Sequence, residues 1–246
     1  MRRYDEYKYS GVEIIGVISV YLTVLAMTAY FFYRSVWVFV ISLVGIPIFL
    51  KYYKRILIKK RKEKLAEEFA EVLYSVNANV KAGYATENAF WEARKDIILF
   101  YGENSLMAEE LLTIKKGIGI NRTLESLLLN LGERSGVEDI LIFSRVFETA
   151  KRNGGNMNKV LERTADTLRA KIEIEKEIQV LIAEKRFELK IMECIPFFII
   201  AYIGFTSKGY FDPMYHNLKG IAVMSICLLV YVGASILGQK LVEIDV

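Results

Sequence analysis

The chain has 246 residues, of which 53% are hydrophobic and 25% charged, with a mean hydropathy of +0.27 and a formal net charge of +4. The 13% aromatic content, the two cysteines and the lack of a glycine period exclude a disordered chain, a disulfide-stapled secreted domain and a collagen-like repeat. The apolar residues concentrate near the two ends, so we expect an integral membrane protein, and a charge this small does not by itself indicate nucleic-acid binding.

The first apolar run lies near the start of the chain. Residues 14–33 carry no charge, and at about 1.5 Å per residue a helix of this length crosses the roughly 30 Å hydrocarbon layer of a membrane. A cleavable signal peptide would have a shorter apolar core, whereas this run ends in four aromatic residues typical of a membrane interface, so we expect no cleavage. After Arg34, the uncharged residues 35–50 predict a second span, so that residues 11–53 form a transmembrane hairpin.

Residues 54–64 form a basic segment directly after this hairpin. Positions 51 to 62 include no acidic residue, whereas Arg34 is the only base in the turn of the hairpin. The positive-inside rule therefore predicts that both termini and the central part of the chain are cytoplasmic. Because this region follows a span, we interpret the bases of positions 51 to 62 as ligands of anionic lipid headgroups rather than of nucleic acid. The seven bases are Lys51, Lys54, Arg55, Lys59, Lys60, Arg61 and Lys62.

Residues 65–190 contain no proline and mix charged and apolar residues at helical spacing, which predicts one all-helical domain. In three places a base shortly precedes a glycine, and we expect that glycine to end a helix at a left-handed C-terminal cap. This spacing predicts three helical hairpins in series, or six helices. The turns are centred on Gly83, on Gly117 and on the pair Gly154 and Gly155.

Two of the helices that enter these turns carry apolar stripes at helical spacing. We interpret the stripes as core faces, because a helical apolar stripe usually packs against a neighbouring helix. The acidic residues Glu67, Glu68 and Glu71 are expected to form a solvated face instead. The predicted core positions are Phe69, Val72 and Val76 before the first turn, and Ile140, Phe143 and Phe147 before the third.

No helix-breaking residue interrupts residues 156–189, so we expect one long helix that leaves the domain and runs toward a third span. Such a helix suits force transmission, a passive stalk or a dimerising coiled coil. Residues 191–240 are predicted to hold two C-terminal transmembrane helices, the second at the uncharged residues 220–239. Ala234 and Gly238 in this last span have the spacing of small residues in closely packed membrane helices.

Groups able to carry catalysis are few in this sequence. His216 is the only histidine, so neither a histidine-based triad nor a multi-histidine metal site can form from this chain alone. The phosphate-binding G-x-x-x-x-G-K-[ST] loop of ATP-driven motors is absent. Cys194 and Cys227 are expected to be ordinary membrane-helix residues, and Glu13 and Glu193 to lie at the membrane interface. We therefore predict no enzymatic activity, no cofactor and no metal.

Three stretches of the chain resemble a known protein family. Residues 65–93 contain the run EFAEVLYSVNANVKAGYATENAFWEA, residues 123–136 read TLESLLLNLGERSG, and residues 141–169 read LIFSRVFETAKRNGGNMNKVLERTADTLR. Their order and spacing resemble the F-domain platform proteins of type II secretion systems. The layout of two spans, a domain and two spans is similar in particular to the TadB/TadC-like proteins of Tad/Flp (type IV) pili.

The resemblance implies an F domain at residues 65–190 and a non-enzymatic, multi-pass scaffold in the inner (cytoplasmic) membrane. Such proteins take mechanical work from a separate cytoplasmic hexameric ATPase and pass it to the extraction and assembly of pilin subunits. The implied partners are this ATPase, pilins, membrane lipids and an F-domain paralogue or a second copy of the chain. Arg134 stands where the family tends to carry an arginine before a turn, and is a candidate partner contact. The residues leave two other functions open, a transporter or channel subunit and a membrane-anchored signalling protein with a helical stalk.

Overall fold

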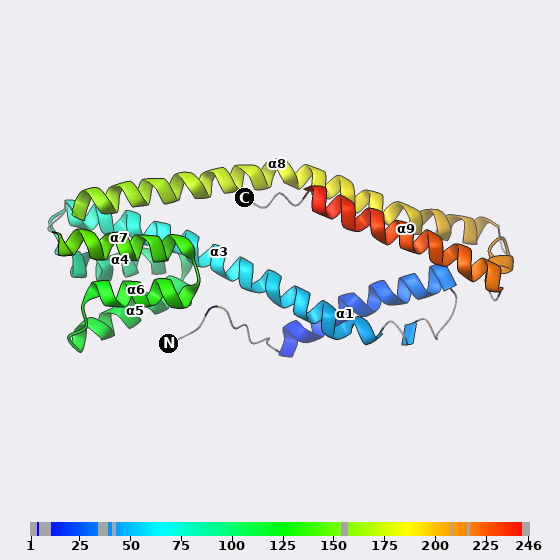
Figure 1. The fold of residues 1–246 in the computed structure, drawn as a ribbon, viewed down its shortest axis with the longest axis horizontal. Helices are drawn as coiled ribbons and strands as arrows, with labels where there is room; N and C mark the ends of the chain where they lie inside the picture. Colours follow the sequence, from blue (N-terminus) through cyan, green and yellow to red (C-terminus); the bar gives the residue numbers. More distant parts are fainter. Residues whose placement is uncertain are drawn as a thin grey trace. The chain divides into compact units, whose positions relative to one another are not determined.

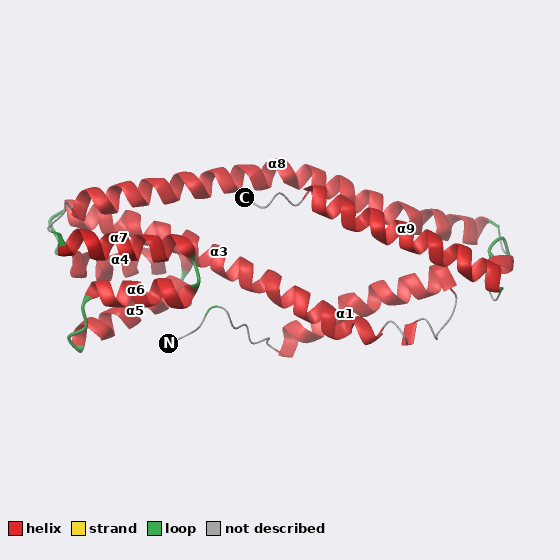
Figure 2. Ribbon diagram, viewed as in Figure 1, coloured by secondary structure: helices red, strands yellow, loops and turns green. Residues whose placement is uncertain are grey.

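The computed structural model describes residues 4, 11–33, 39–40, 43–153, 157–207, 209–215 and 217–242. Each regular element in these ranges is a helix, which confirms the predicted all-α class (Figure 1, Figure 2). A π-helical turn, Ala29–Tyr33, continues the first helix, and Leu43–Gly45 and Asp212–Met214 are 3-10 turns. The α-helices are α1 (Gly11–Thr28), α3 (Ile46–Lys81), α4 (Thr86–Tyr101), α5 (Leu106–Gly119), α6 (Leu124–Ser135), α7 (Glu138–Arg152), α8 (Met157–Thr206) and α9 (Leu218–Val242).

The chain divides into two compact units. One contains Met1–Lys8 and Tyr53–Ile174, and we call it the bundle; the other contains Tyr9–Tyr52 and Glu175–Val246, and we call it the apolar unit. The boundaries expected after residues 53 and 190 fall inside α3 and α8, which are both continuous helices. Two helices therefore pass without a break from one unit into the other.

Six helical segments supply the described part of the bundle: α3 from Tyr53 onward, the whole of α4 to α7, and the start of α8. α4 packs against α5, and α6 packs against both α5 and α7. Aromatic rings fill the centre, with ring centroids 5.4 Å apart for Phe69 and Phe143 and 5.5 Å apart for Phe143 and Phe147. These rings are fully buried, which confirms the predicted core faces; the same holds for Val72, Val76 and Ile140.

Gly83 stands in the turn between α3 and α4. Its φ is +96°, a backbone conformation that residues with a Cβ rarely adopt, so this turn requires a glycine. Gly154 and Gly155, expected to form the third turn, lie outside the described residues.

Gly117 does not end a helix, contrary to the sequence-based expectation. It is buried within α5, which continues to Gly119, and Asn121 takes the left-handed conformation after the helix with a φ of 62°. The physical reason is close packing, because a Cβ on Gly117 would stand 2.6 Å from the side chain of Leu127 in α6. The glycine at this position thus serves the contact between α5 and α6 rather than the turn.

A second glycine sets the distance between α6 and α7. A Cβ on Gly132 would stand 2.7 Å from the Cα of Leu141 and 3.3 Å from the carbonyl oxygen of Ile140. Close by, the buried hydroxyl of Ser144 donates a hydrogen bond of 2.8 Å to the carbonyl of Leu128 across the same pair of helices. The two backbones approach closely because the residues between them are small.

The apolar unit contains the candidate membrane spans. In the described part of the chain, three helices are long and apolar enough to cross a membrane: Glu13–Tyr33, Asn158–Thr206 and Lys219–Val242. They correspond to the first, third and fourth predicted spans. The second predicted span, residues 35–50, includes positions outside the described residues. The third is not a separate helix, because α8 reaches it directly from the bundle and contains Pro196 within its length.

α8 and α9 pack against each other within the apolar unit. Gly238 permits the contact, since a Cβ there would stand 2.6 Å from the side chain of Leu189. Ala234, the other member of the small-residue pair, is exposed. The hydroxyl of Tyr231 donates to the backbone carbonyl of Glu193 at 2.8 Å, which adds a polar link between the two helices.

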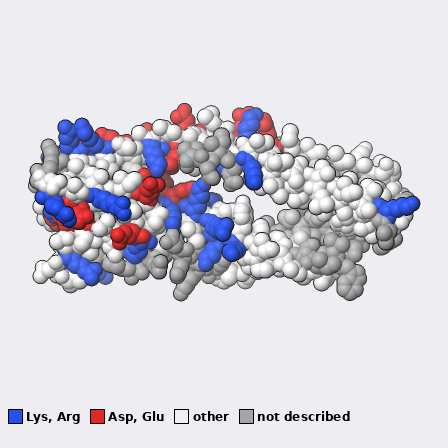
Figure 3. All heavy atoms as spheres, viewed as in Figure 1, with Lys and Arg blue, Asp and Glu red and all other residues white. Residues whose placement is uncertain are grey.

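Charged side chains gather over the bundle, whereas the visible surface of α9 and the end of α8 carries few of them (Figure 3). Large apolar side chains are exposed there instead, with exposed fractions of 73% for Phe198, 86% for Phe205 and 72% for Leu229. Apolar surface on this scale marks a contact with lipid or with another protein.

Candidate functional site

Arg134, the candidate partner contact, lies in the last turn of α6 beside α5. Its guanidinium forms a bidentate pair with the carboxylate of Glu110, in which Nη1 donates to Oε1 at 2.9 Å and Nη2 donates to Oε2 at 2.7 Å. Its Nε also donates to Oδ1 of Asn130 at 3.4 Å. The Arg134 side chain is only 11% exposed and that of Glu110 only 7%. The structure directs Arg134 into the bundle, and its role toward a partner stays a prediction.

Tyr4 completes this group from the start of the chain. Its ring is 1% exposed, and its hydroxyl donates a hydrogen bond of 2.9 Å to Oε1 of Glu110. The guanidinium of Arg61 on α3 lies 5.0 Å from the centroid of the Tyr4 ring, within the range of a cation–π contact. Burial raises the pKa of the Tyr4 hydroxyl, so it remains a donor at physiological pH.

We call Tyr4, Glu110 and Arg134 the N-terminal clasp. The hydrogen bonds from Arg134 to Glu110 raise the pKa of the guanidinium, so Arg134 stays charged across the physiological range. In a two-pronged pair of this kind each partner satisfies the other, and removal of one leaves an unpaired buried charge. The clasp therefore holds Tyr4 against α5 and α6. Sequence reasoning missed Tyr4, because its partner lies 106 residues away and no periodic pattern connects them.

Glu68 lies in the centre of the bundle rather than on the expected solvated face. It is fully buried, and its Oε2 accepts a hydrogen bond of 2.8 Å from the backbone N–H of Met107. The side-chain hydroxyl oxygen of Ser105, the N-cap of α5, accepts a hydrogen bond of 3.1 Å from the backbone N–H of Ala108. Glu68 thus helps to cap α5 from α3, at the helix end where the dipole favours a negative charge. Burial raises the pKa of its carboxyl group.

The bases of the expected lipid-binding cluster are spread along α3. Arg61 is partly buried against Tyr4 and so contributes to the clasp as well. Lys51, Arg55 and Lys60 are exposed. Contact of this cluster with lipid headgroups stays a prediction.

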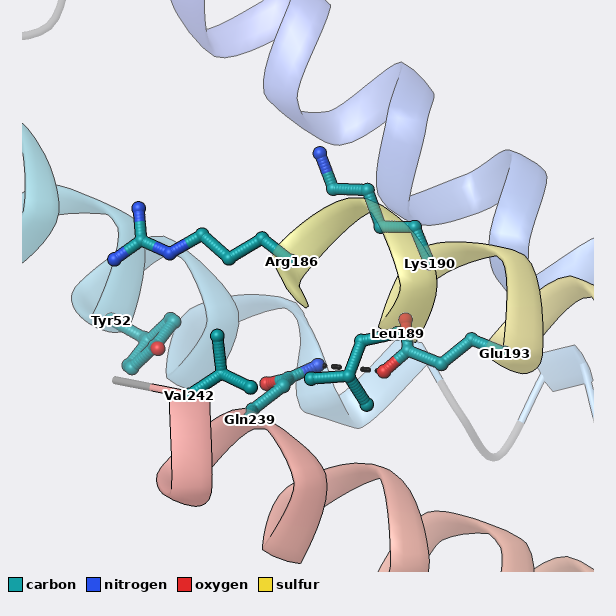
Figure 4. Close-up of a pocket in the computed structure, with 7 residues that line it drawn as sticks. All are labelled: Tyr52, Arg186, Leu189, Lys190, Glu193, Gln239 and Val242. Atoms are coloured by element: carbon teal, nitrogen blue, oxygen red, sulfur yellow. Dashed lines mark hydrogen bonds between the residues drawn. The ribbon is translucent and has the colours of Figure 1, made fainter. Parts of the chain in front are cut away.

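Glu193 forms a polar cluster between α8 and α9. Oε1 of its carboxylate accepts a hydrogen bond from the hydroxyl of Ser235. The same oxygen accepts a second hydrogen bond, at 3.0 Å, from Nε2 of Gln239 (Figure 4). Glu193 was expected to lie at the membrane interface, and that stays a prediction; its hydrogen-bond partners lie on the neighbouring helix, α9. The residues around it also line a cavity of about 210 Å³, which is formed by Tyr52, Arg186, Leu189, Lys190, Glu193, Gln239 and Val242.

The titratable groups placed above link neighbouring helices. Across the described ranges, no three His, Cys, Asp or Glu side chains lie close enough to hold a metal ion. Cys194 and Cys227 are exposed free thiols on α8 and α9.

A comparison with protein families supplies the context for this arrangement. Residues 95–205 match the family model for type II secretion system (T2SS), protein F. The matched range begins within α4 and includes nearly all of α8, so it contains both members of the Glu110–Arg134 pair. Neither the comparison with curated proteins nor the comparison with solved structures found a match. The family match supports the type II secretion protein F family for this chain and, with the apolar helices, indicates a membrane component of type II secretion or type IV pilus machinery.

Proposed function

We propose that this chain is a non-enzymatic platform protein in the inner membrane, in a Tad-type pilus or related type II secretion machine. It passes the work of a separate cytoplasmic hexameric ATPase to pilin subunits during their extraction and assembly. Its further partners are lipids and an F-domain paralogue or a second copy of the chain. The family match at residues 95–205 supports this proposal at the level of the machine.

The observation that carries the proposal is the continuity of α8. Near its start, Leu161, Ala165 and Leu168 are buried in the bundle core. Near its end, the same helix exposes Phe198 and Phe205 in a segment apolar enough to span a membrane. A load applied to the bundle can therefore act on the membrane segment through one continuous helix, since Pro196, which cannot donate a backbone hydrogen bond, lies within the membrane segment itself.

The N-terminal clasp supports the proposed topology of four spans. Tyr4 precedes α1 in the chain, yet it is buried in the bundle, which follows the first hairpin. The N-terminal segment and the bundle then share one side of the membrane, and the chain must cross an even number of times between them. α1 supplies one crossing, so residues 35–50 supply the return. α8 and α9 form a second pair, which brings the C-terminus back to the same side.

The coupling role of α8 is tested by breaking the helix without removing a contact. Glu177 is exposed within α8, and proline at this position would remove a backbone hydrogen bond and kink the helix. We expect Glu177→Pro to abolish surface fibre assembly while the chain still inserts in the membrane, and Glu177→Ala to behave as wild type. Normal fibre assembly by Glu177→Pro would refute coupling through α8.

The partners are tested by affinity purification of the tagged chain from membranes. We expect an assembly ATPase and pilin to be recovered with the wild-type chain, and fibres to be lost when its gene is deleted. The platform role is wrong if fibres persist after deletion and neither protein is recovered.

A further inference from the structure

The cavity beside Glu193 lies where the membrane-type parts of α8 and α9 end. The uncharged stretch of α8 begins directly after Glu193, and that of α9 ends at Gln239, just before Lys240. All seven residues that line the cavity belong to the apolar unit. Under the proposed topology, which this inference requires, the cavity opens at headgroup depth on the cytoplasmic side.

Two cations at this cavity have no counter-ion within the described residues. Arg186 and Lys190 are one helical turn apart on α8, so they project from the same face. Neither has a hydrogen-bond or ion-pair partner in the described ranges, whereas nearby Lys185 is paired with Glu188 at 3.0 Å. The Glu193 carboxylate directs Oε1 to Ser235 and Gln239 on α9.

The remaining lining groups complement these cations. Tyr52 brings a phenolic hydroxyl from α3, while Leu189 and Val242 bring apolar surface from α8 and α9 (Figure 4). Cationic and hydroxyl donors beside an apolar wall match a phosphate group that is attached to an acyl chain. The apolar wall lies at the end of a membrane-type helix, where acyl chains are present, and this position favours a lipid over a soluble protein as the ligand.

We propose that this cavity binds the phosphate of one anionic phospholipid, with Arg186 and Lys190 as its charged ligands. Tyr52 donates a further hydrogen bond, and the first acyl methylenes lie against Leu189 and Val242. Such a site differs from the basic segment on α3, because it holds one lipid between helices rather than attracting many lipids diffusely. A bound lipid here fixes the α8 and α9 pair at the point where force from the bundle enters the membrane.

The test is native mass spectrometry of the full chain, purified from phosphatidylcholine nanodiscs that contain phosphatidylglycerol. We expect the wild type to retain one phosphatidylglycerol, and Arg186→Gln/Lys190→Gln to retain it about tenfold less, because two charge-assisted contacts are lost. The exposed bases Lys116 and Arg122 of the bundle, which belong to neither lipid-binding group, supply the matched control, and Lys116→Gln/Arg122→Gln should retain the lipid. Arg186→Lys/Lys190→Arg keeps both charges and should also retain it.

Equal retention by wild type and Arg186→Gln/Lys190→Gln would overturn the site, and so would equal loss in the two glutamine variants, which would indicate diffuse attraction. Inorganic phosphate added in excess is the second arm: displacement of the lipid by phosphate would show a site for soluble phosphate instead. The readout does not involve the ATPase or pilin. A failed lipid result therefore leaves the platform proposal standing, and a failed pull-down leaves the lipid site standing.

Discussion

Phe143 and Phe198 are the same side chain in two contrasting regions of the molecule. Phe143 is fully buried among Phe69 and Phe147 in the bundle, whereas Phe198 on α8 is 73% exposed in the apolar unit. The bundle buries its apolar surface within the chain. The apolar unit leaves its surface for a partner outside the chain, which for helices of this length and composition is the lipid bilayer.

Mean hydropathy locates membrane segments, but it does not show which apolar residues are buried within the protein. In the bundle, polar and charged residues are frequent, and the core is specified by helical spacing and by a few buried polar groups such as Glu68 and Glu110. In the apolar unit, polar links are few among the described residues, and small residues such as Gly238 decide how closely α8 and α9 approach.

The largest expected effect is the difference in stability loss between Phe143→Ala and Phe198→Ala. Phe143→Ala removes a buried ring from the aromatic core and should destabilise the bundle by about 3–5 kcal/mol. Phe198→Ala leaves no cavity in the protein and should change stability by less than about 0.5 kcal/mol. Unfolding of the full chain in detergent, followed by the fluorescence of Trp91 in a Trp37→Phe background and by circular dichroism, measures both. Equal destabilisation by the two changes would erase the distinction between the regions.

The next largest expected effect is the loss of stability when the buried pair in the N-terminal clasp is broken. Arg134→Ala leaves Glu110 buried without its cation, and we expect a loss of about 3 kcal/mol, near the low end for buried pairs because both side chains keep slight exposure. The matched change is Arg152→Ala, which breaks an exposed pair with Glu148 on α7 and should cost about 0.5 kcal/mol or less. The same unfolding experiment compares them. A loss no greater for Arg134→Ala than for Arg152→Ala would show that the buried pair contributes little.

The third expected effect is a loss of stability from steric crowding between α6 and α7 in the bundle. Gly132→Ala places a methyl group 2.7 Å from the Cα of Leu141, so α6 and α7 must separate, at a cost of about 1–3 kcal/mol. Gly119→Ala meets nothing within 4 Å and should be neutral or slightly stabilising, because alanine favours the helix. Thermal unfolding would distinguish the two variants. If they are equally stable, the close approach of α6 and α7 is not a constraint.

The smallest effect concerns pH. Burial raises the pKa of Glu68 above its ordinary value near 4.5, so the folded state binds a proton more tightly than the unfolded state. The stability associated with this group is therefore greatest below the unfolded pKa and declines as pH rises through the folded one. Glu68→Gln retains an acceptor for the Met107 N–H and removes the titration, so its stability relative to wild type should rise across that range. A constant difference at all pH values would show that Glu68 does not titrate on folding.

Sequence patterns predicted the regular part of this architecture and missed the contacts between distant segments. The stripe at Phe69 and the unbroken helix after residue 156 were predictable, because helical spacing is a local property. Gly117 was misinterpreted because a glycine that ends a helix and one that admits a neighbouring side chain look alike in sequence. Tertiary packing forms the hydrogen bonds between Tyr4 and Glu110 and between Glu193 and Ser235, and no local sequence pattern encodes it.

The proposed function requires the bundle to lie on one side of a membrane and the loop between α8 and α9 to lie on the other. This is measured by labelling single cysteines with a membrane-impermeant maleimide in sealed, right-side-out vesicles, in a Cys194→Ala/Cys227→Ala background. Lys116 on the bundle and Asn217 in the loop are both exposed and serve as the two sites. We predict that Asn217→Cys is labelled in sealed vesicles, and that Lys116→Cys is labelled only after detergent opens them. Labelling of Lys116→Cys in sealed vesicles, or equal labelling of both sites, would contradict the account.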